Sequence, residues 1–161
     1  MRPMTNSLRE QIQIYIKNKK DISDLIADID LKGENLSHAV VKYLNRVNCD
    51  LRGINWSYCL LGSEDKIFSI IQCDISNSNF ENAKFVGSTF IRSCKAHNCN
   101  FKNADLSKVD YQYTDCGETS NFCNAIIQIS TRKGLGAKFP KSMFEDLCRG
   151  WNTKFKIIED K

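Results

Sequence analysis

The 161-residue chain has no long apolar run, and this absence limits where the protein can reside. A helix that crosses a membrane needs about 18 or more apolar residues in succession, and no segment approaches that length. The first residues also lack the apolar stretch and the small-residue cleavage site of a secretory signal. Because disulfides persist mainly in oxidising compartments, we expect a cytoplasmic protein with no membrane attachment and with reduced cysteines.

Residues that usually carry catalysis or hold a cofactor are also scarce. There are only two histidines, and His97 falls where we expect a solvated side chain; the other is His38. Cys94 and Cys99 are separated by four residues, and the pair Cys116 and Cys123 by six, whereas zinc knuckles typically separate their cysteines by two. The short run Gly134–Gly136 lacks the full pattern of a phosphate-binding loop. These absences predict a protein that is not an enzyme and that holds no cofactor and no metal.

The chain has no strong excess of either charge. Its formal net charge is +4, which is modest for this length. A local basic patch near the C-terminus is the one candidate interaction patch in the charge pattern: Arg132, Lys133, Lys138 and Lys141. It could contact nucleic acid or an acidic partner, or it could be a solvated loop. We favour the solvated loop and do not expect nucleic acid as a partner.

The sequence does contain an eight-residue motif, which occurs three times at intervals of 21 residues. It occupies Ser78–Phe85, then Cys99–Leu106, then Ser120–Ile127. Within this stretch, large apolar residues fall every five residues, and a small residue usually lies two places earlier. A period of five matches neither the 3.6 of a helix nor the 2 of a strand. It suits a solenoid that turns a corner every five residues.

This pattern of a small residue, an Asn or Asp, and a large apolar residue resembles the pentapeptide-repeat family. The resemblance implies an all-β solenoid, a right-handed quadrilateral β-helix with five residues on each side and with the large and small positions pointing inward. Four sides of five residues account for 20, so the interval of 21 predicts one extra residue at a corner. We place it between Phe90 and Ala96 in one coil and between Tyr111 and Gly117 in the next, at the same corner.

The five-residue phase can be followed backwards, which places the β-helix at residues 29–129 in about five coils. Stacking the coils predicts one inward column of large residues: Leu36, Trp56, Phe80, Phe101 and Phe122. An asparagine precedes each of them, and in-register amides bond along a column in stacked β assemblies. We therefore predict an asparagine ladder: Asn35, Asn55, Asn79, Asn100 and Asn121. Arg46 interrupts the phase, so residues 38–46 can be read either as β-helix coil or as a short helix.

Cysteines fit this scheme as structural residues. Five of the eight occupy the small inward position, where a thiol acts as a compact apolar group: Cys49, Cys59, Cys73, Cys94 and Cys99. We expect them to be buried and free.

The chain is longer than the repeat requires between Leu61 and Ile75. The surplus is polar and lies near residues 62–66, so we expect a loop that bulges from the shaft. Functional segments often lie on loops held by a rigid scaffold, but such a bulge can also be merely tolerated.

Both ends carry helical signals. Ser7 and Glu10 have the spacing of a capping box, and apolar residues at intervals of four predict an amphipathic helix over about residues 8–18. Asp21 predicts a second helix start, which makes residues 1–28 an N-terminal helical cap. After residue 129, we expect a basic loop and a C-terminal helical cap over residues 130–161, with a helix from Pro140 to Gly150. Caps of this kind cover the open strand edges of a solenoid, and the C-terminal one could also join two copies of the chain as a homodimer.

Two functions follow from these expectations. The first is a non-enzymatic scaffold that presents flat β-helix faces to an unknown protein partner. The second is a DNA mimic that acts on a type II topoisomerase, which the resemblance implies because gyrase-protecting quinolone-resistance proteins share this family. A DNA mimic needs a strongly acidic shaft, yet residues 29–129 carry eleven acidic and ten basic residues. We therefore favour the scaffold.

Overall fold

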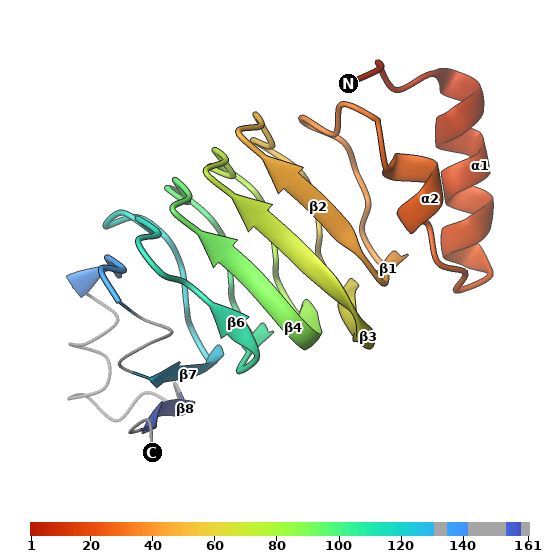
Figure 1. Cartoon of the computed structure of the whole chain (residues 1–161). Helices are drawn as coiled ribbons and strands as arrows, with labels where there is room; N and C mark the ends of the chain where they lie inside the picture. Colours follow the sequence, from red (N-terminus) through yellow and green to blue (C-terminus); the bar gives the residue numbers. More distant parts are fainter. Residues whose placement is uncertain (131–134, 142–153, 159–161) are drawn as a thin grey trace.

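The computed structural model describes residues 1–130, 135–141 and 154–158, and it shows a parallel β-solenoid with two helices at its N-terminal end (Figure 1). Parallel ladders run along the shaft, and one coil takes part in them at Asp74, Asn79, Lys84 and Phe90. Four ladder positions about five residues apart make each coil four-sided, as the repeat predicted. The ladder that begins at Asn35 has five levels, so about four turns separate its first level from its last.

Short strands form the sides of the coils. In chain order they are β1 (Val40–Val41), β2 (Leu44–Val47), β3 (Leu60–Ile71), β4 (Lys84–Arg92), β5 (Asp105–Leu106), β6 (Val109–Asp110), β7 (Ile126–Ser130) and β8 (Lys154–Ile158). Hydrogen bonds connect them in the order β1-β3-β4-β5-β7-β8, while β2 pairs with β3 and β6 pairs with β4. Of the two readings of residues 38–46, the structure therefore has the β-helix coil and not the helix.

The interior is a stack of large apolar side chains. The rings of Trp56 and Phe80 are parallel at 6.5 Å, those of Phe80 and Phe101 at 5.1 Å, and those of Phe101 and Phe122 at 4.8 Å. Leu36 is buried at the N-terminal end of this column. At the other end, the ring of Phe139 packs edge-on against Phe122 at 5.7 Å. The predicted aromatic column is thus continuous from coil to coil.

Corners of the coil have a fixed backbone conformation. The second residue after an inward large residue adopts a positive φ, as at Asn82, Asn103 and Asn124, each with φ 57°. Asparagine and glycine tolerate this left-handed region better than other residues. The positive φ at this corner therefore explains why the second asparagine of the repeated eight-residue motif stands there.

The small inward residue links neighbouring coils through its side chain. Ser78 Oγ donates a hydrogen bond to the carbonyl of Leu51 (3.3 Å) and accepts one from the N–H of Ile54 (3.2 Å). The thiol of Cys99 likewise donates to the carbonyl of Ile75 (3.2 Å). A cysteine at this position therefore contributes a hydrogen bond in addition to its apolar volume.

Two helices cover the first coil. Helix α1 (Asn6–Lys17) buries Ile12, and α2 (Ser23–Ile26) buries Ile26. The N-cap of α1 is Thr5, whose Oγ1 accepts a hydrogen bond from the N–H of Leu8 (3.2 Å). The predicted capping box was wrong, because the N-cap lies two residues before the predicted one, Ser7. In the described part of the chain, no helix is long and apolar enough to cross a membrane.

Arg46 occupies an inward position although its side chain is charged. It is 6% exposed, and its guanidinium donates to the carbonyls of Ile26 (2.6 Å), Ala27 (2.5 Å) and Ile29 (3.2 Å). The carbonyls of Ile26 and Ala27 lie at the C-terminal end of α2, where backbone acceptors have no partner within the helix, and that of Ile29 lies just beyond it. Arg46 therefore joins the helical cap to the first coil, which explains the interruption of the apolar phase.

The extra residues of the 21-residue intervals do not lie at one corner, contrary to the sequence prediction. Lys84 pairs with Asp105, but Thr89 pairs with Val109, so coil residues 85–88 contain the first extra residue. Inward packing therefore shifts from Phe90 to Ile91, which is 1% exposed. The second extra residue lies between Asp115 and Asn121, because Asp115 pairs with a residue 20 positions earlier and Asn121 with one 21 earlier.

At the C-terminal end, β8 pairs in parallel with β7 along its whole length, for example Ile127 with Phe155. Residues 154–158 thus extend the sheet, where the sequence suggested part of a helical cap. The helix predicted from Pro140 to Gly150 lies outside the described residues beyond Lys141.

Candidate functional site

One side of the shaft is formed by β2, the C-terminal half of β3, the C-terminal half of β4, and β6, which lie side by side in Figure 1. We call it the β3–β4 face. Its outward side chains form two rows across the coils, because in-register neighbours point the same way. The rows are Asn45, Ser69, Phe90 and Asp110, and Val47, Ile71 and Arg92.

Apolar side chains gather on this face. Val47 is 47% exposed and Ile67 is 54% exposed, while Ile71 and Phe90 are half-buried. Ser69 points outward between them but is only 7% exposed, because its in-register neighbours cover it. We call these four side chains, Val47, Ile67, Ile71 and Phe90, the apolar centre of the β3–β4 face.

The charged residues of the face neutralise each other. Arg92 Nη2 lies 2.5 Å from Asp110 Oδ2, and the Asp110 side chain is only 9% exposed. The Arg92 guanidinium also lies over the ring of Phe90, 4.4 Å from its centroid. Because Arg92 and Asp110 neutralise each other, neither offers a free charge to an ionic ligand.

The predicted bulge borders this face. The pairing of β3 with β4 shifts between Ser63 and Phe68, where four residues of β3 lie opposite one residue of β4. The ammonium group of Lys66 lies over the ring of Tyr43, 4.5 Å from its centroid, and Ser63 Oγ donates to the carbonyl of Lys42 (3.4 Å). The bulge is therefore a β-bulge held against the first coil, and not a detached loop.

Two glycines permit the bulge. A Cβ on Gly62 would lie 2.2 Å from the carbonyl oxygen of Val86, and one on Gly87 would lie 2.0 Å from that of Ser63. Both glycines have a positive φ, 89° and 66°. Backbone of adjacent coils thus approaches so closely here that any side chain would force it apart.

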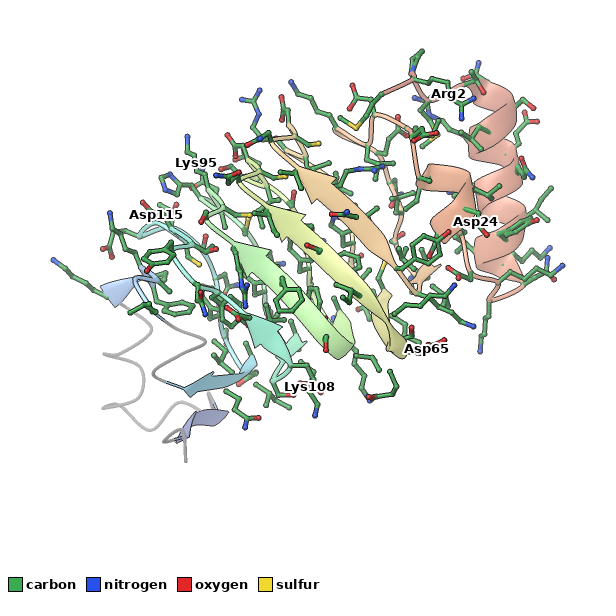
Figure 2. The ribbon with its side chains drawn as sticks, in the orientation of Figure 1. Arg2, Asp24, Asp65, Lys95, Lys108 and Asp115 are labelled. Carbon is green, nitrogen blue, oxygen red and sulfur yellow. The ribbon has the colours of Figure 1, made fainter. Side chains whose placement is uncertain are left out.

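Between the bulge and β4 lies a hollow of about 300 Å³. Its lining includes Phe90, Glu64, Lys108 and Asp110. Figure 2 shows Asp65, at the bulge, and Lys108 along the same edge of the shaft, opposite the edge that carries Lys95 and Asp115. The hollow is open and mixed in charge, which makes it an indentation at the border of the apolar centre.

The five asparagines predicted as a ladder lie in one column on another side of the shaft. After the first asparagine, each Nδ2 donates to the Oδ1 of the asparagine one coil earlier: Asn55 to Asn35 (3.1 Å), Asn79 to Asn55 (3.4 Å), Asn100 to Asn79 (3.1 Å) and Asn121 to Asn100 (3.3 Å). Each Oδ1 also accepts a backbone N–H two residues later, for example that of Ser57 (3.1 Å). Because the amides are bonded to each other and to the turns, the ladder is a structural feature.

The predicted basic patch is only partly described. Arg132 and Lys133 lie outside the described residues. Lys138 is exposed and its ammonium lies 3.9 Å from Asp115, whereas the backbone N–H of Lys141 donates to Glu118 (2.9 Å). Acidic residues thus accompany the two described lysines.

Cysteine chemistry is suppressed by burial at most positions. All seven cysteines in the described residues are free, and Cys49 and Cys123 are the half-buried ones. Burial raises the pKa of Cys59, Cys94 and Cys99 to about 12. Among the described residues, no group of three or more His, Cys, Asp or Glu side chains could hold a metal ion.

Sequence reasoning missed the β3–β4 face because it assigned Phe90 to the interior. A signal was available in the doubled apolar residues Ile70-Ile71 and Phe90-Ile91. Each inward position needs only one large residue, so one member of each pair had to point outward: Ile71 in the first pair and Phe90 in the second.

The four-sided coil, the inward column and the ladders define a pentad-based β-solenoid. The family described as pentapeptide repeats matches residues 70–110 in eight copies. Residues 70–110 therefore carry pentapeptide repeats, and the coils observed on both sides of the matched segment continue the same geometry.

Comparisons with individual proteins find only distant likenesses. No curated protein matches the chain. Among solved structures, a pentapeptide repeat protein from the Arabidopsis thaliana thylakoid lumen is 14% identical over 74% of each chain, with a TM-score of 0.41. Trypsin-treated QnrB1, a plasmid-mediated fluoroquinolone resistance protein, is 15% identical over 75% of this chain and 82% of its own, with a TM-score of 0.24. Likenesses of this size carry no argument about function.

Proposed function

We propose that this protein is a non-enzymatic scaffold that binds a protein partner through the β3–β4 face. The observation that carries the proposal is the apolar centre of this face. Single exposed apolar residues are ordinary on protein surfaces, but contiguous ones mark interaction sites. Val47 and Ile71 are in-register neighbours, and Ile67 lies on the same strand as Ile71.

The chemistry of the face favours a protein as its ligand. Arg92 and Asp110 pair with each other, so the face offers neither a basic surface for phosphates nor an acidic one for a DNA-binding protein. A partner surface with an apolar centre and little net charge complements it. Such surfaces are typical of the cores of protein–protein interfaces.

Chemical cross-linking in an extract of the source cell tests this proposal with matched variants. Ile67→Asp and Val47→Asp place a charge in the apolar centre. Ile126→Asp places the same charge at a residue that is 40% exposed on a different side of the shaft. Circular dichroism and thermal melting show whether each variant keeps the fold.

We expect one cross-linked protein to be shared by the wild type and Ile126→Asp and to be lost from both face variants. That protein, once purified, should bind the wild type at least tenfold more tightly than Ile67→Asp. Equal binding by the wild type and the folded face variants would overturn the assignment of the face, and loss of binding only in Ile126→Asp would move the site to another side.

A further inference from the structure

Three thiols form a column at one inner corner of the shaft. Cys49, Cys73 and Cys94 occupy the same small position in successive coils, since Asp50, Asp74 and Lys95, which follow them, are ladder partners. Cys73 and Cys94 are 2% and 3% exposed, whereas Cys49 is half-buried. Only the first thiol of the column is therefore open to reagents in solution.

Cys49 and Cys73 are in direct contact. The backbone N–H of Cys49 donates to Cys73 Sγ (3.3 Å), and the N–H of Asp74 donates to the carbonyl of Cys49 (3.1 Å). The Cys73 thiol also lies 3.6 Å from the carbonyl of Arg46, so it points back toward the coil of Cys49.

The Cys49 side chain is less constrained. Its thiol donates to the carbonyl of Val47, two residues earlier in the same coil (3.2 Å). Among the described residues, it makes no hydrogen bond to an earlier coil. It lines a shallow hollow of about 520 Å³ together with Asp50, Arg52 and Asp74. Turning this side chain about its Cα–Cβ bond requires no change in the backbone.

We propose that Cys49 and Cys73 form a reversible redox site, in which a peroxide oxidises Cys49 and Cys73 then closes an intrachain disulfide. Adjacent strands are about 4.8 Å apart, and this spacing falls within the Cα–Cα range of about 4.4–6.8 Å found for disulfides. The bond would close the segment between Cys49 and Cys73, which contains β3 and its bulge. The proposal is independent of any partner of the β3–β4 face.

The chemistry proceeds in two balanced steps. The Cys49 thiolate attacks one peroxide oxygen, so a sulfur–oxygen bond forms, the oxygen–oxygen bond breaks, and hydroxide leaves from hydrogen peroxide. Sulfur is oxidised to a sulfenic acid and the peroxide is reduced. The sulfur of Cys73 then attacks the sulfur of Cys49, the sulfur–oxygen bond breaks, and the oxygen leaves as water with the proton of the Cys73 thiol.

Exposure determines the order of the steps. Burial raises the pKa of the Cys73 thiol, and this effect outweighs the opposing hydrogen bond from the backbone N–H of Cys49. Because the thiolate is the reactive form, Cys73 reacts slowly with free peroxide and acts instead on the sulfenic acid beside it.

The test uses the full chain with Cys148, which lies outside the described residues, replaced by serine. The folded protein is treated with hydrogen peroxide, the remaining thiols are alkylated after denaturation, and peptides are mapped by mass spectrometry. We expect an intact mass lower by two hydrogens before alkylation, a Cys49–Cys73 cross-linked peptide after it, and full reversal by dithiothreitol.

Variants separate this site from general oxidation. Cys73→Ser should leave Cys49 as a sulfenic acid that dimedone traps, and Cys49→Ser should protect Cys73 at least tenfold. Cys94→Ser and Cys123→Ser should not change the cross-link. Serine occupies the equivalent small position at Ser78 and Ser120, so these variants are expected to fold. A Cys73–Cys94 disulfide, an intermolecular disulfide, or Cys49 oxidised with Cys73 still fully alkylated would each overturn the proposal.

Discussion

Phe101 lies in the middle of the aromatic column, with a parallel ring on each side at 5.1 and 4.8 Å. Emptying such a site removes both buried area and ring contacts. We expect Phe101→Ala to lower the free energy of unfolding by about 3–5 kcal/mol, the usual range for a core aromatic. The midpoint of urea unfolding measures this loss.

Phe90 provides the matched control, because it is the same residue type on the outside of the shaft. We expect Phe90→Ala to cost clearly less, since only the contact with Arg92 and part of the apolar surface are lost. Equal losses for the two variants would mean that the outward placement of Phe90 is wrong.

Cys99 allows the effect of pH on stability to be tested at one residue. Burial raises its pKa to about 12, whereas an unfolded cysteine ionises near pH 8.5. The folded pKa is the higher one, so its contribution to stability is complete below about pH 8.5 and is lost as the pH rises toward 12. Cys99→Ser removes this dependence and keeps the hydrogen bond, as the neighbouring coils do with Ser78 and Ser120.

Unfolding midpoints at pH 8 and pH 10 measure the difference. Between these values, we expect the wild type to lose about 2 kcal/mol more than Cys99→Ser, because a cysteine with a pKa near 8.5 in the unfolded chain is mostly ionised at pH 10 while the folded one keeps its proton. Parallel pH profiles for the two proteins would show that Cys99 is not shielded from solvent.

At the scale of the element, the bulge between β3 and β4 depends on Gly87. A Cβ there would lie 2.0 Å from the carbonyl oxygen of Ser63, whereas a Cβ on Gly53 would meet nothing closer than Gly33 Cα at 3.8 Å. The two glycines have nearly the same φ, 66° and 71°. We expect Gly87→Ala to destabilise by about 1–3 kcal/mol more than Gly53→Ala, because only the former forces the coils apart.

Thermal melting and urea unfolding of the two alanine variants check this expectation. The difference between them removes the shared cost of a positive φ for alanine. If Gly53→Ala proved as costly as Gly87→Ala, the close approach of the coils at the bulge would not be a source of strain.

Features that repeat in every coil were predictable from the sequence. Features that depend on contacts between one coil and the next, or between a coil and the N-terminal helices, were not. The pentad phase placed Phe101 and Asn100 in their columns because each coil imposes the same inward and outward positions on its residues. It could not place the extra residue near Gly87, since a bulge in one coil shifts the corner of the next. It also could not anticipate the role of Arg46, whose partners are carbonyls of a helix that precedes the repeat.

At the scale of the whole molecule, the distribution of charge separates the scaffold from a DNA mimic. Residues 29–129 carry eleven acidic and ten basic residues, which gives a net charge of −1. Several acids also face a base on a neighbouring coil, such as Asp50 with Lys32 at 2.7 Å and Glu81 with Lys102 at 4.0 Å. The shaft therefore lacks the dense negative surface that could replace DNA in a topoisomerase.

We accordingly expect no inhibition and no protection of gyrase in a supercoiling assay at micromolar protein and moderate salt. Inhibition that weakens as salt is added would contradict this expectation and would make the DNA mimic the leading function.

The position of α1 and β8 at opposite ends of the shaft has a mechanical consequence (Figure 1). A force that pulls these two ends apart acts along the axis, so it opens the ladders between one coil and the next instead of shearing all of them together. Since each coil contacts only its neighbours, the shaft should yield in steps. A typical coil of 21 residues would release roughly 70 Å of chain at about 3.4 Å per residue. In single-molecule stretching, we expect the molecule to extend at low force in a series of similar increments, one for each coil that opens.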